Sequence, residues 1–316
     1  MHIVIPDDYQ DCVRGLDCYA RLASHQVTIF HDACKDEDEL ARRFAQAEAI
    51  VLTRERTALS ASLLERLPGL KLISQIGKVA GHIDLEACRR LGIAVAQGSG
   101  SGAATAELAW ALVLASRRHL VDEALRLRQG LWQGSLGQEL KGQRLGVWSY
   151  GRIGKQVAGY GKAFGMRVWT WGSPDALARA RADGIEAAPS RAEFFTGSDV
   201  LSLHIRLSDR TRGIVTPEDL ARMGRNALLV NTSRAELIAP GALESALRAG
   251  APGYAAVDVY EEEPPAPGHR NPLLDLPNAL CTPHLGYVER DNYENYFGIA
   301  FDNINNFASG KPTNLV

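Results

Sequence analysis

Short apolar stretches alternate with amphipathic stretches along the whole chain. In the first third of the sequence, the apolar stretches predict β-strands at residues 2–5, 27–30, 49–53, 71–76 and 93–97. Helical patterns lie between them, at residues 37–47 and 60–66. The apolar stretches contain few polar positions, which is typical of parallel sheets that helices cover on both faces.

A second series of predicted strands follows, at residues 144–148, 166–171, 199–205, 226–232, 253–259 and 279–284. Between the two series, residues 103–130 are rich in alanine and leucine and predict one long helix that ends at Gly130. A last helix, predicted over 291–309, is too isolated to form a domain alone, so we expect it to pack on the first unit. This predicts a discontinuous domain of residues 1–99 and 286–316, with a second domain of residues 100–285 inserted into it.

The composition is that of an ordinary globular protein, with 46% hydrophobic residues and a formal net charge of −2. We expect no nucleic-acid partner, because binding phosphate backbones needs a concentrated basic surface. We expect no membrane partner, because no apolar stretch is long enough to span a bilayer. The spacing of the five cysteines matches no zinc or redox motif, so we predict no metal site and the reduced thiols of a cytoplasmic protein.

Residues 149–154, with the sequence SYGRIG, follow one predicted strand and precede a predicted helix that starts at Arg152. Dinucleotide-binding turns have the pattern G-x-G-x-x-G, and Gly151 and Gly154 match its last two glycines. Ser149 replaces the first glycine, and we expect it to fit if its φ angle is negative. Because the start of a helix offers N–H groups and a positive dipole end to a phosphate, this turn predicts a dinucleotide site.

The next predicted strand ends at Trp171, after which NAD-dependent enzymes usually carry an acid that binds the adenine ribose. Gly172 stands at this position, so no carboxylate repels a 2′-phosphate. No arginine follows directly, and Arg179 and Arg181 fit a solvated helix face equally well. The sequence therefore leaves NAD and NADP both open, with NAD slightly favoured.

Polar residues follow the ends of three later strands, where open parallel sheets bind their ligands. Arg234 lies in VNTSR, Glu263 in DVYEEEP and His284 in TPHLG. With GRIG at 151–154 and LSLHIRLSDRTRG at 201–213, these ordered motifs resemble the D-isomer-specific 2-hydroxyacid dehydrogenase family, from about residue 49 to the end. The resemblance implies an α/β fold of two doubly wound parallel-sheet domains, with a Rossmann NAD(P)-binding domain inserted into a flavodoxin-like substrate domain.

The resemblance also implies that Arg234, Glu263 and His284 are the catalytic residues. A protonated histidine can deliver a proton to the carbonyl oxygen of a 2-keto acid while hydride reaches the carbon, and it acts as a base in the reverse reaction. Glu263 would orient the ring and stabilise its protonated form. Arg234 can bind the substrate carboxylate with two parallel hydrogen bonds and polarise the carbonyl.

Cofactor contacts are implied at positions that match the family motifs, with a purely structural role left equally open for His204. These residues are Thr105, Gly151, Arg152, Ile153, Gly154, Gly172, Ser173, His204, Thr232, Ser233, Asp258 and Gly286.

Substrate contacts are implied for Arg54, Arg56, Lys78 and Val79, besides Arg234 and His284. The amides of Lys78 and Val79 would hold the substrate carboxylate, while the Lys78 side chain points either into the pocket or to solvent. If the chain stays extended after residue 53, Arg54 and Arg56 share one face. Two arginines at these places bind the substrate phosphate in D-3-phosphoglycerate dehydrogenases, and the alternative is a solvated pair. The expected substrate is thus a small anionic 2-keto or 2-hydroxy acid, with 3-phosphoglycerate among the candidates.

The family usually forms dimers, so a homodimer is expected as well. A different class of function, a non-catalytic dinucleotide-sensing scaffold similar to a corepressor, is the alternative. The complete set of arginine, glutamate and histidine favours the enzyme, because sensing alone does not need all three.

Overall fold

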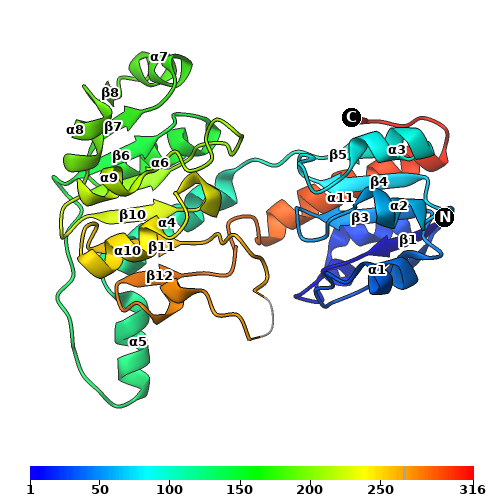
Figure 1. The fold of residues 1–316 in the computed structure, drawn as a ribbon, viewed down its shortest axis with the longest axis horizontal. Coiled ribbons are helices and arrows are strands. Elements are labelled where there is room, and N and C mark those ends of the chain that lie inside the picture. The colour runs from blue at the N-terminus through cyan, green and yellow to red at the C-terminus, as the bar shows by residue number, and fades with distance from the viewer. Residues whose placement is uncertain (266–267) are drawn as a thin grey trace. The chain divides into compact units, whose positions relative to one another are not determined.

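The computed structural model describes residues 1–265 and 268–316, which form two compact units (Figure 1). Unit 1 comprises Met1–Ser101 and Glu289–Val316, and unit 2 comprises Gly102–Val288. Within the described part of the chain, no helix is long and apolar enough to cross a membrane.

Unit 1 is built on a parallel sheet with the strand order β2-β1-β3-β4-β5, the doubly wound order of flavodoxin-like folds. Its strands are β1 His2–Ile5, β2 Gln26–Ile29, β3 Ala49–Thr53, β4 Leu72–Ile76 and β5 Ala94–Gln97. Its α-helices are α1 Glu37–Phe44, α2 Ala61–Glu65, α3 Leu85–Leu91 and α11 Arg290–Ala308, and two short 3-10 helices are η1 Val13–Gly15 and η2 Asp17–Leu22.

Helices cover both faces of this sheet, which explains why its strands are apolar throughout. On one face, Phe44 of α1, Leu63 of α2 and Cys88 of α3 are buried in one cluster with the strands. On the other face lies α11, where Phe297 and Phe301 are buried. The Ser74 hydroxyl of β4 donates to the Ala300 carbonyl of α11 at 3.0 Å, so the last helix is an integral layer of unit 1.

Unit 2 contains a parallel sheet in the order β12-β11-β10-β9-β6-β7-β8, which is the Rossmann order with one further strand. Its strands are β6 Arg144–Trp148, β7 Arg167–Trp171, β8 Glu186–Ala187, β9 Val200–Leu203, β10 Leu228–Asn231, β11 Tyr254–Val257 and β12 Ala279–Cys281. Its α-helices are α4 Ala103–Arg117, α5 Leu120–Arg128, α6 Arg152–Ala163, α7 Pro174–Ala182, α8 Arg191–Thr196, α9 Pro217–Ala221 and α10 Ala242–Ala249, with 3-10 helices η3 Ala235–Leu237 and η4 Pro272–Asp275. The predicted fold class, two doubly wound parallel sheets, is confirmed.

Two apolar clusters cover the two faces of the unit 2 sheet. Helices α4, α6 and α7 contribute to one cluster, which includes Trp110 and Val157. Helices α8, α9 and α10 contribute to the other, which includes Phe194, Leu220 and Leu247. The sheet is therefore buried on both sides, and its edges are where polar side chains can gather.

The prediction of one long helix over 103–130 is wrong, because α4 ends at Arg117 and α5 starts at Leu120. Between them, His119 has a left-handed backbone with φ +50°. The two helices also differ in environment, since Ala106 and Val113 of α4 are fully buried whereas no residue of α5 is buried. The alanine and leucine content continues across the break, so the sequence pattern contains no stop signal there.

Candidate active site

The predicted site residues of unit 2 gather at the carboxyl edge of its sheet. β6 leads into Gly151–Gly154, β7 into Gly172 and Ser173, β9 into His204, β10 into Thr232–Arg234, β11 into Asp258, and β12 into His284–Gly286. The chain runs outward from β6 in one direction to β7 and in the other to β9. Such a reversal of strand order is where open α/β sheets bind their ligands.

The turn after β6 differs in one respect from the expectation, because Ser149 has a positive φ of +78°. Its N–H donates to the Trp171 carbonyl at 2.8 Å, which fixes the turn against the end of β7. The tight turn therefore requires the left-handed conformation that glycine usually supplies, and here a serine adopts it. The sequence could not reveal this, because a serine at this position carries no signal for a positive φ.

The two glycines of the turn face different surroundings. A Cβ on Gly154 would collide with the Ser149 carbonyl, so Gly154 is needed for helix α6 to pack against the turn. A Cβ on Gly151 would meet no protein atom within 4 Å, so the space beside it is open. Gly151 is the N-cap of the twelve-residue helix α6 and has no side chain to cap it. An open space at an uncapped helix start fits a pyrophosphate, which can approach the backbone closely there.

A second feature that fits a bound dinucleotide lies at the end of β10. Thr232 is only 6% exposed, and its Oγ1 has no hydrogen-bond partner within the described residues. Buried hydroxyls are normally satisfied, so this atom has hydrogen-bonding capacity for a ligand. Ser233, which follows, is instead occupied by the protein, because its hydroxyl donates to the Leu203 carbonyl at 2.7 Å.

His284 and Glu263 are in contact, as the resemblance to the family implies. His284 Nδ1 and Glu263 Oε2 form a short contact between the two side chains, which are 18% and 31% exposed, respectively. The Tyr260 N–H donates to the other Glu263 oxygen, Oε1, at 2.7 Å and so fixes the carboxylate. The His284 and Tyr287 rings also pack in a T-shaped arrangement, with centroids 5.2 Å apart. Because Nδ1 faces the carboxylate, Nε2 is the ring atom available for proton transfer.

Asp258 organises the segment that carries His284. Its carboxylate is fully buried and accepts hydrogen bonds from Thr282 Oγ1 at 2.6 Å, Leu285 N at 2.7 Å and Gly286 N at 2.8 Å. Burial raises the pKa of Asp258, while these hydrogen bonds and nearby His284 oppose the rise. His284 itself has a left-handed backbone with φ +51°, a conformation that the surrounding hydrogen bonds hold in place.

Thr105 connects the start of α4 to the same segment. Its hydroxyl donates to the Gly286 carbonyl at 2.7 Å. A Cβ on Gly286 would lie 3.2 Å from Asp258 Oδ2 and 3.4 Å from Thr105 Cγ2, so this position has little room for a side chain. Thr105 and Gly286 are therefore brought together with Asp258.

Arg234 follows β10 in a turn built by Asn231. Asn231 donates from Nδ2 to the Arg234 carbonyl at 2.9 Å and accepts from the Ser233 N–H at 3.0 Å. Arg234 Nη1 donates to the Ser233 carbonyl at 2.7 Å, and its backbone is extended. Asn231 and Tyr260 are positioning residues that the sequence analysis missed, although an asparagine directly after a strand is a recognisable turn signal.

His204 directly follows β9 and is partly buried. Desolvation lowers its pKa to about 4, so the ring is neutral at physiological pH. The ring Nε2 of His204 lies 2.9 Å from Ser202 Oγ, and the backbone N–H of His204 donates to the Trp148 carbonyl at 3.0 Å. These contacts give His204 a structural role, which is one of the two alternatives that the sequence left open. A contact between His204 and the cofactor stays a prediction.

In unit 1, the prediction that Arg54 and Arg56 share one face of an extended run is wrong. β3 ends at Thr53, and Arg54 has a left-handed backbone with φ +56°, so the chain turns there. The Arg54 side chain reaches Gly77, where a Cβ would collide with its Nη1. Arg56 points elsewhere: its Nη1 donates to the Asp7 carbonyl at 2.5 Å, and its guanidinium stacks 4.2 Å from the centroid of the Tyr9 ring.

The loop after β4 carries the other two predicted substrate residues. Lys78 is exposed, which matches the solvent alternative for its side chain in this structure. Val79 is partly buried against the unit 1 core, and its N–H donates to Gln97 Oε1 at 3.3 Å. The amide expected to hold a substrate carboxylate is thus engaged with Gln97, which lies at the end of β5.

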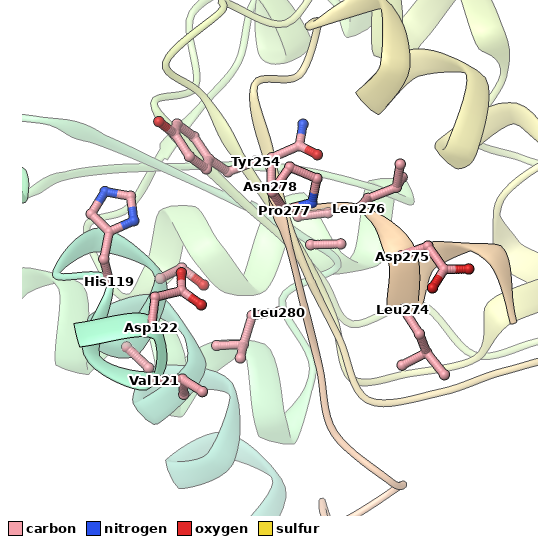
Figure 2. Close-up of a pocket in the computed structure, with 14 residues that line it drawn as sticks. His119, Val121, Asp122, Tyr254, Leu274, Asp275, Leu276, Pro277, Asn278 and Leu280 are labelled. Atoms are coloured by element: carbon pink, nitrogen blue, oxygen red, sulfur yellow. The ribbon is translucent and has the colours of Figure 1, made fainter. Parts of the chain in front are cut away.

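A pocket of about 320 Å³ lies elsewhere in unit 2, and Figure 2 shows His119, Asp122, Tyr254 and Asn278 around it. It is bounded by the junction of α4 and α5, by η4 and by residues 276–280. None of its lining residues is a predicted catalytic or cofactor residue, so it is a separate feature from the carboxyl edge of the sheet.

Residues 110–286, most of unit 2, match the family model described as D-isomer specific 2-hydroxyacid dehydrogenase, NAD binding domain. A glyoxylate reductase of Aeropyrum pernix is 38% identical over 269 residues, which cover 82% of this chain and 79% of the relative. A D-3-phosphoglycerate dehydrogenase of Methanocaldococcus jannaschii is 36% identical over 79% of this chain, but the match spans only 48% of that relative. The crystal structure of a phosphoglycerate oxidoreductase from Vibrio cholerae O395 superposes with a TM-score of 0.95 at 51% identity, covering 98% of this chain and 99% of that one.

The family match falls on the unit that carries the glycine turn and the paired His284 and Glu263, and the similar proteins extend it to unit 1. The chain therefore belongs to the D-isomer specific 2-hydroxyacid dehydrogenase family and is an oxidoreductase that uses NAD or NADP.

Proposed function

We propose that the protein interconverts a small anionic 2-keto acid and the corresponding D-2-hydroxy acid, with His284 as the acid–base residue. The observation that carries this proposal is the His284–Glu263 pair, which lies at the carboxyl edge of a Rossmann sheet. A histidine bound through one nitrogen to a carboxylate is suited to move a proton through the other.

In the direction of reduction, His284 Nε2 gives a proton to the carbonyl oxygen, while Nδ1–H stays hydrogen-bonded to Glu263. A bound nicotinamide would supply the hydride to the carbonyl carbon. Arg234 binds the substrate carboxylate and polarises the carbonyl, since a guanidinium can donate two parallel hydrogen bonds. In oxidation, Nε2 takes the proton back from the hydroxyl group.

The dinucleotide would be held along the carboxyl edge of the unit 2 sheet. The turn from Gly151 to Gly154 would receive its pyrophosphate, with the N–H groups of Arg152 and Ile153 as donors. Gly172 and Ser173 would border the adenine ribose. Towards the nicotinamide, the unpartnered Thr232 hydroxyl supports a direct contact. Other predicted contacts on this side are Thr105, Ser233 and Asp258. His204 would contact the ribose or the adenine edge, and Gly286 is a further predicted cofactor contact.

The substrate class follows from Arg234 and from the relatives, which are named for glyoxylate, hydroxypyruvate and phosphoglycerate. Arg54, Arg56, Lys78 and Val79 belong to unit 1 and stay predictions as substrate contacts. Arg56 is held by Asp7 and Tyr9 in this structure.

The test compares wild type with His284→Asn, because asparagine tolerates the left-handed backbone at this position. Turnover of glyoxylate, hydroxypyruvate and 3-phosphohydroxypyruvate is followed with NADH and with NADPH. We expect kcat of the variant to fall roughly 10²–10⁴-fold with unchanged dinucleotide binding. Near-normal turnover would remove His284 from this role. A wild type that binds dinucleotide but reduces no 2-keto acid would favour the non-catalytic scaffold.

We further propose that the protein is a homodimer in which α5 and the segment after it contact a second copy. Leu127, Trp132 and Leu136 are 60%, 74% and 93% exposed, an unusual amount of apolar surface in one stretch. The segment is nevertheless held in place, since the Glu123 carboxylate accepts from Gly134 N at 3.1 Å and Ser135 Oγ at 2.7 Å. Sedimentation should give a dimer for wild type and a monomer for Trp132→Asp; a monomeric wild type would refute the proposal.

A further inference from the structure

The end of β7 determines which adenine ribose the dinucleotide site can accept. Gly172 follows this strand and offers only backbone atoms where an acid would bind the ribose 2′-hydroxyl. Its position is directly beside the glycine turn, because a Cβ on Gly172 would lie 3.4 Å from Ser149 Cα. The ribose edge of the site therefore has no carboxylate from β7 that would repel a 2′-phosphate.

A cation reaches the same turn from the following helix. Arg179 of α7 donates from Nε to the Tyr150 carbonyl at 3.2 Å. Tyr150 lies inside the glycine turn, between Ser149 and Gly151, so this bond brings the guanidinium to the turn itself. The bond uses only Nε, and the described residues supply no partner for either Nη group of Arg179. The exposed Arg179 side chain is thus held through Nε, while its two Nη groups are available to a ligand.

Asp175 and Asp183 lie one helical turn away from Arg179, and neither forms an ion pair with it among the described residues. Asp183, at the end of α7, is paired with Lys155 Nζ at 2.8 Å and accepts from the Tyr150 hydroxyl at 3.0 Å. Those two partners lower the pKa of Asp183, which is thus engaged away from Arg179. Asp175 is exposed to solvent in the first turn of α7. Arg152, the first residue of helix α6, adds a second positively charged side chain next to the glycine turn.

We propose that the protein prefers NADP(H) over NAD(H), with Arg179 binding the 2′-phosphate of the adenine ribose. A guanidinium fixed through Nε can present both Nη groups to one phosphate, which is a favourable geometry for a dianion. The inference rests on the proposed dinucleotide site at residues 151–154, and it reverses the slight preference for NAD that the sequence suggests. The sequence could not decide between Arg179 and Arg181 as the phosphate ligand. The structure favours Arg179, because only Arg179 is brought to the glycine turn by a described contact.

The experiment is a calorimetric titration of the intact protein with NAD⁺, NADP⁺ and adenosine 2′-monophosphate. We expect wild type to bind NADP⁺ at least about tenfold more tightly than NAD⁺, as a charge-assisted phosphate contact provides. Arg179→Ala should lose about that factor for NADP⁺ and for adenosine 2′-monophosphate while NAD⁺ binding is kept, and Arg179→Lys should fall between the two. Arg181→Ala, on the same helix, is the matched control and should leave all three affinities unchanged.

Equal or tighter binding of NAD⁺ by wild type would overturn the proposal. An equal loss of both dinucleotides in Arg179→Ala would also overturn it, since Arg179 would then serve only the turn. If neither dinucleotide binds, the site itself is wrong and the proposal falls with it. If NADP⁺ binds as expected but no 2-keto acid is reduced, the preference stands and only the proposed reaction fails.

Discussion

His204 should make the stability of unit 2 depend on pH between neutral and mildly acidic conditions. In the folded protein, desolvation lowers its pKa from 6.5 to about 4. In the unfolded chain the imidazole is solvated and protonates near its ordinary pKa. Below pH 6.5 the unfolded state therefore binds a proton that the folded state does not, and folding stability decreases as the pH falls towards 4.

The size of the effect follows from the shift itself. Lowering the pKa from 6.5 to about 4 corresponds to roughly 3 kcal/mol once the pH is below both values. Between pH 7 and pH 4.5, about 2 kcal/mol of this should be lost. Carboxylates elsewhere also titrate in this range, so the contribution of His204 has to be measured as a difference between two proteins.

We would compare wild type with His204→Gln, which keeps a polar side chain near Ser202 but does not titrate. The free energy of unfolding is measured in urea at pH 7 and pH 4.5, with tryptophan fluorescence as the signal. All five tryptophans lie in unit 2, so this signal reports the unit that contains His204. His269, which is exposed in the same unit, provides the control variant His269→Gln.

The stability of wild type relative to His204→Gln should fall by about 2 kcal/mol between the two pH values. The same comparison with His269→Gln should show no such change. If the difference between wild type and His204→Gln is the same at both pH values, His204 is not desolvated in the folded state and the reasoning fails.

Three further predictions concern the turn and the segment that carries His284. Gly151→Ala should fold with normal stability, because its Cβ meets no protein atom, but it should weaken dinucleotide binding about tenfold or more. Gly154→Ala should instead lower the melting temperature, because its Cβ would collide with the Ser149 carbonyl. If calorimetry shows the opposite pattern, the assignment of the two glycines is reversed. Ser149→Gly should raise the free energy of unfolding by up to about 1 kcal/mol, since glycine adopts the φ of +78° without strain; a clear loss in urea unfolding would contradict this. Asp258→Asn should destabilise unit 2 by about 1–3 kcal/mol and reduce kcat, because an amide group cannot accept from three donors as the carboxylate does. If kcat of the variant equals that of wild type, the segment that carries His284 does not need Asp258.

The sheets were predictable because their strands are nearly continuous apolar stretches. Residues 49–53 and 144–148 match β3 and β6 to the residue, since a strand buried on both faces has a strong signal. The two-residue strand β8 and the short helices α8 and α9 were not predicted, because so few residues carry no clear period. The break at His119 was missed for a related reason: a left-handed histidine is not a recognisable stop signal.

The candidate site was predictable in its residue types but not in its hydrogen bonds. The sequence indicated His284 and Glu263 as a pair, and the structure brings them into contact. It could not indicate that Arg54 turns away from an extended path, because nothing in the sequence marks a positive φ at an arginine. Nor could it distinguish Arg179 from Arg181, because only the packing of α7 decides which side chain reaches the glycine turn.

The division of unit 1 between two distant segments has a consequence for how the protein is made. On the ribosome, strands β1 to β5 emerge first, but α11, which packs on β4, is made only after all of unit 2. At about 5–20 residues per second, the sheet of unit 1 would wait roughly 10–40 s for its last helix. Unit 2 is continuous and is fully synthesised at residue 288, before α11 is made. Synthesis of unit 1 thus begins before that of unit 2, but unit 1 can be completed only after unit 2.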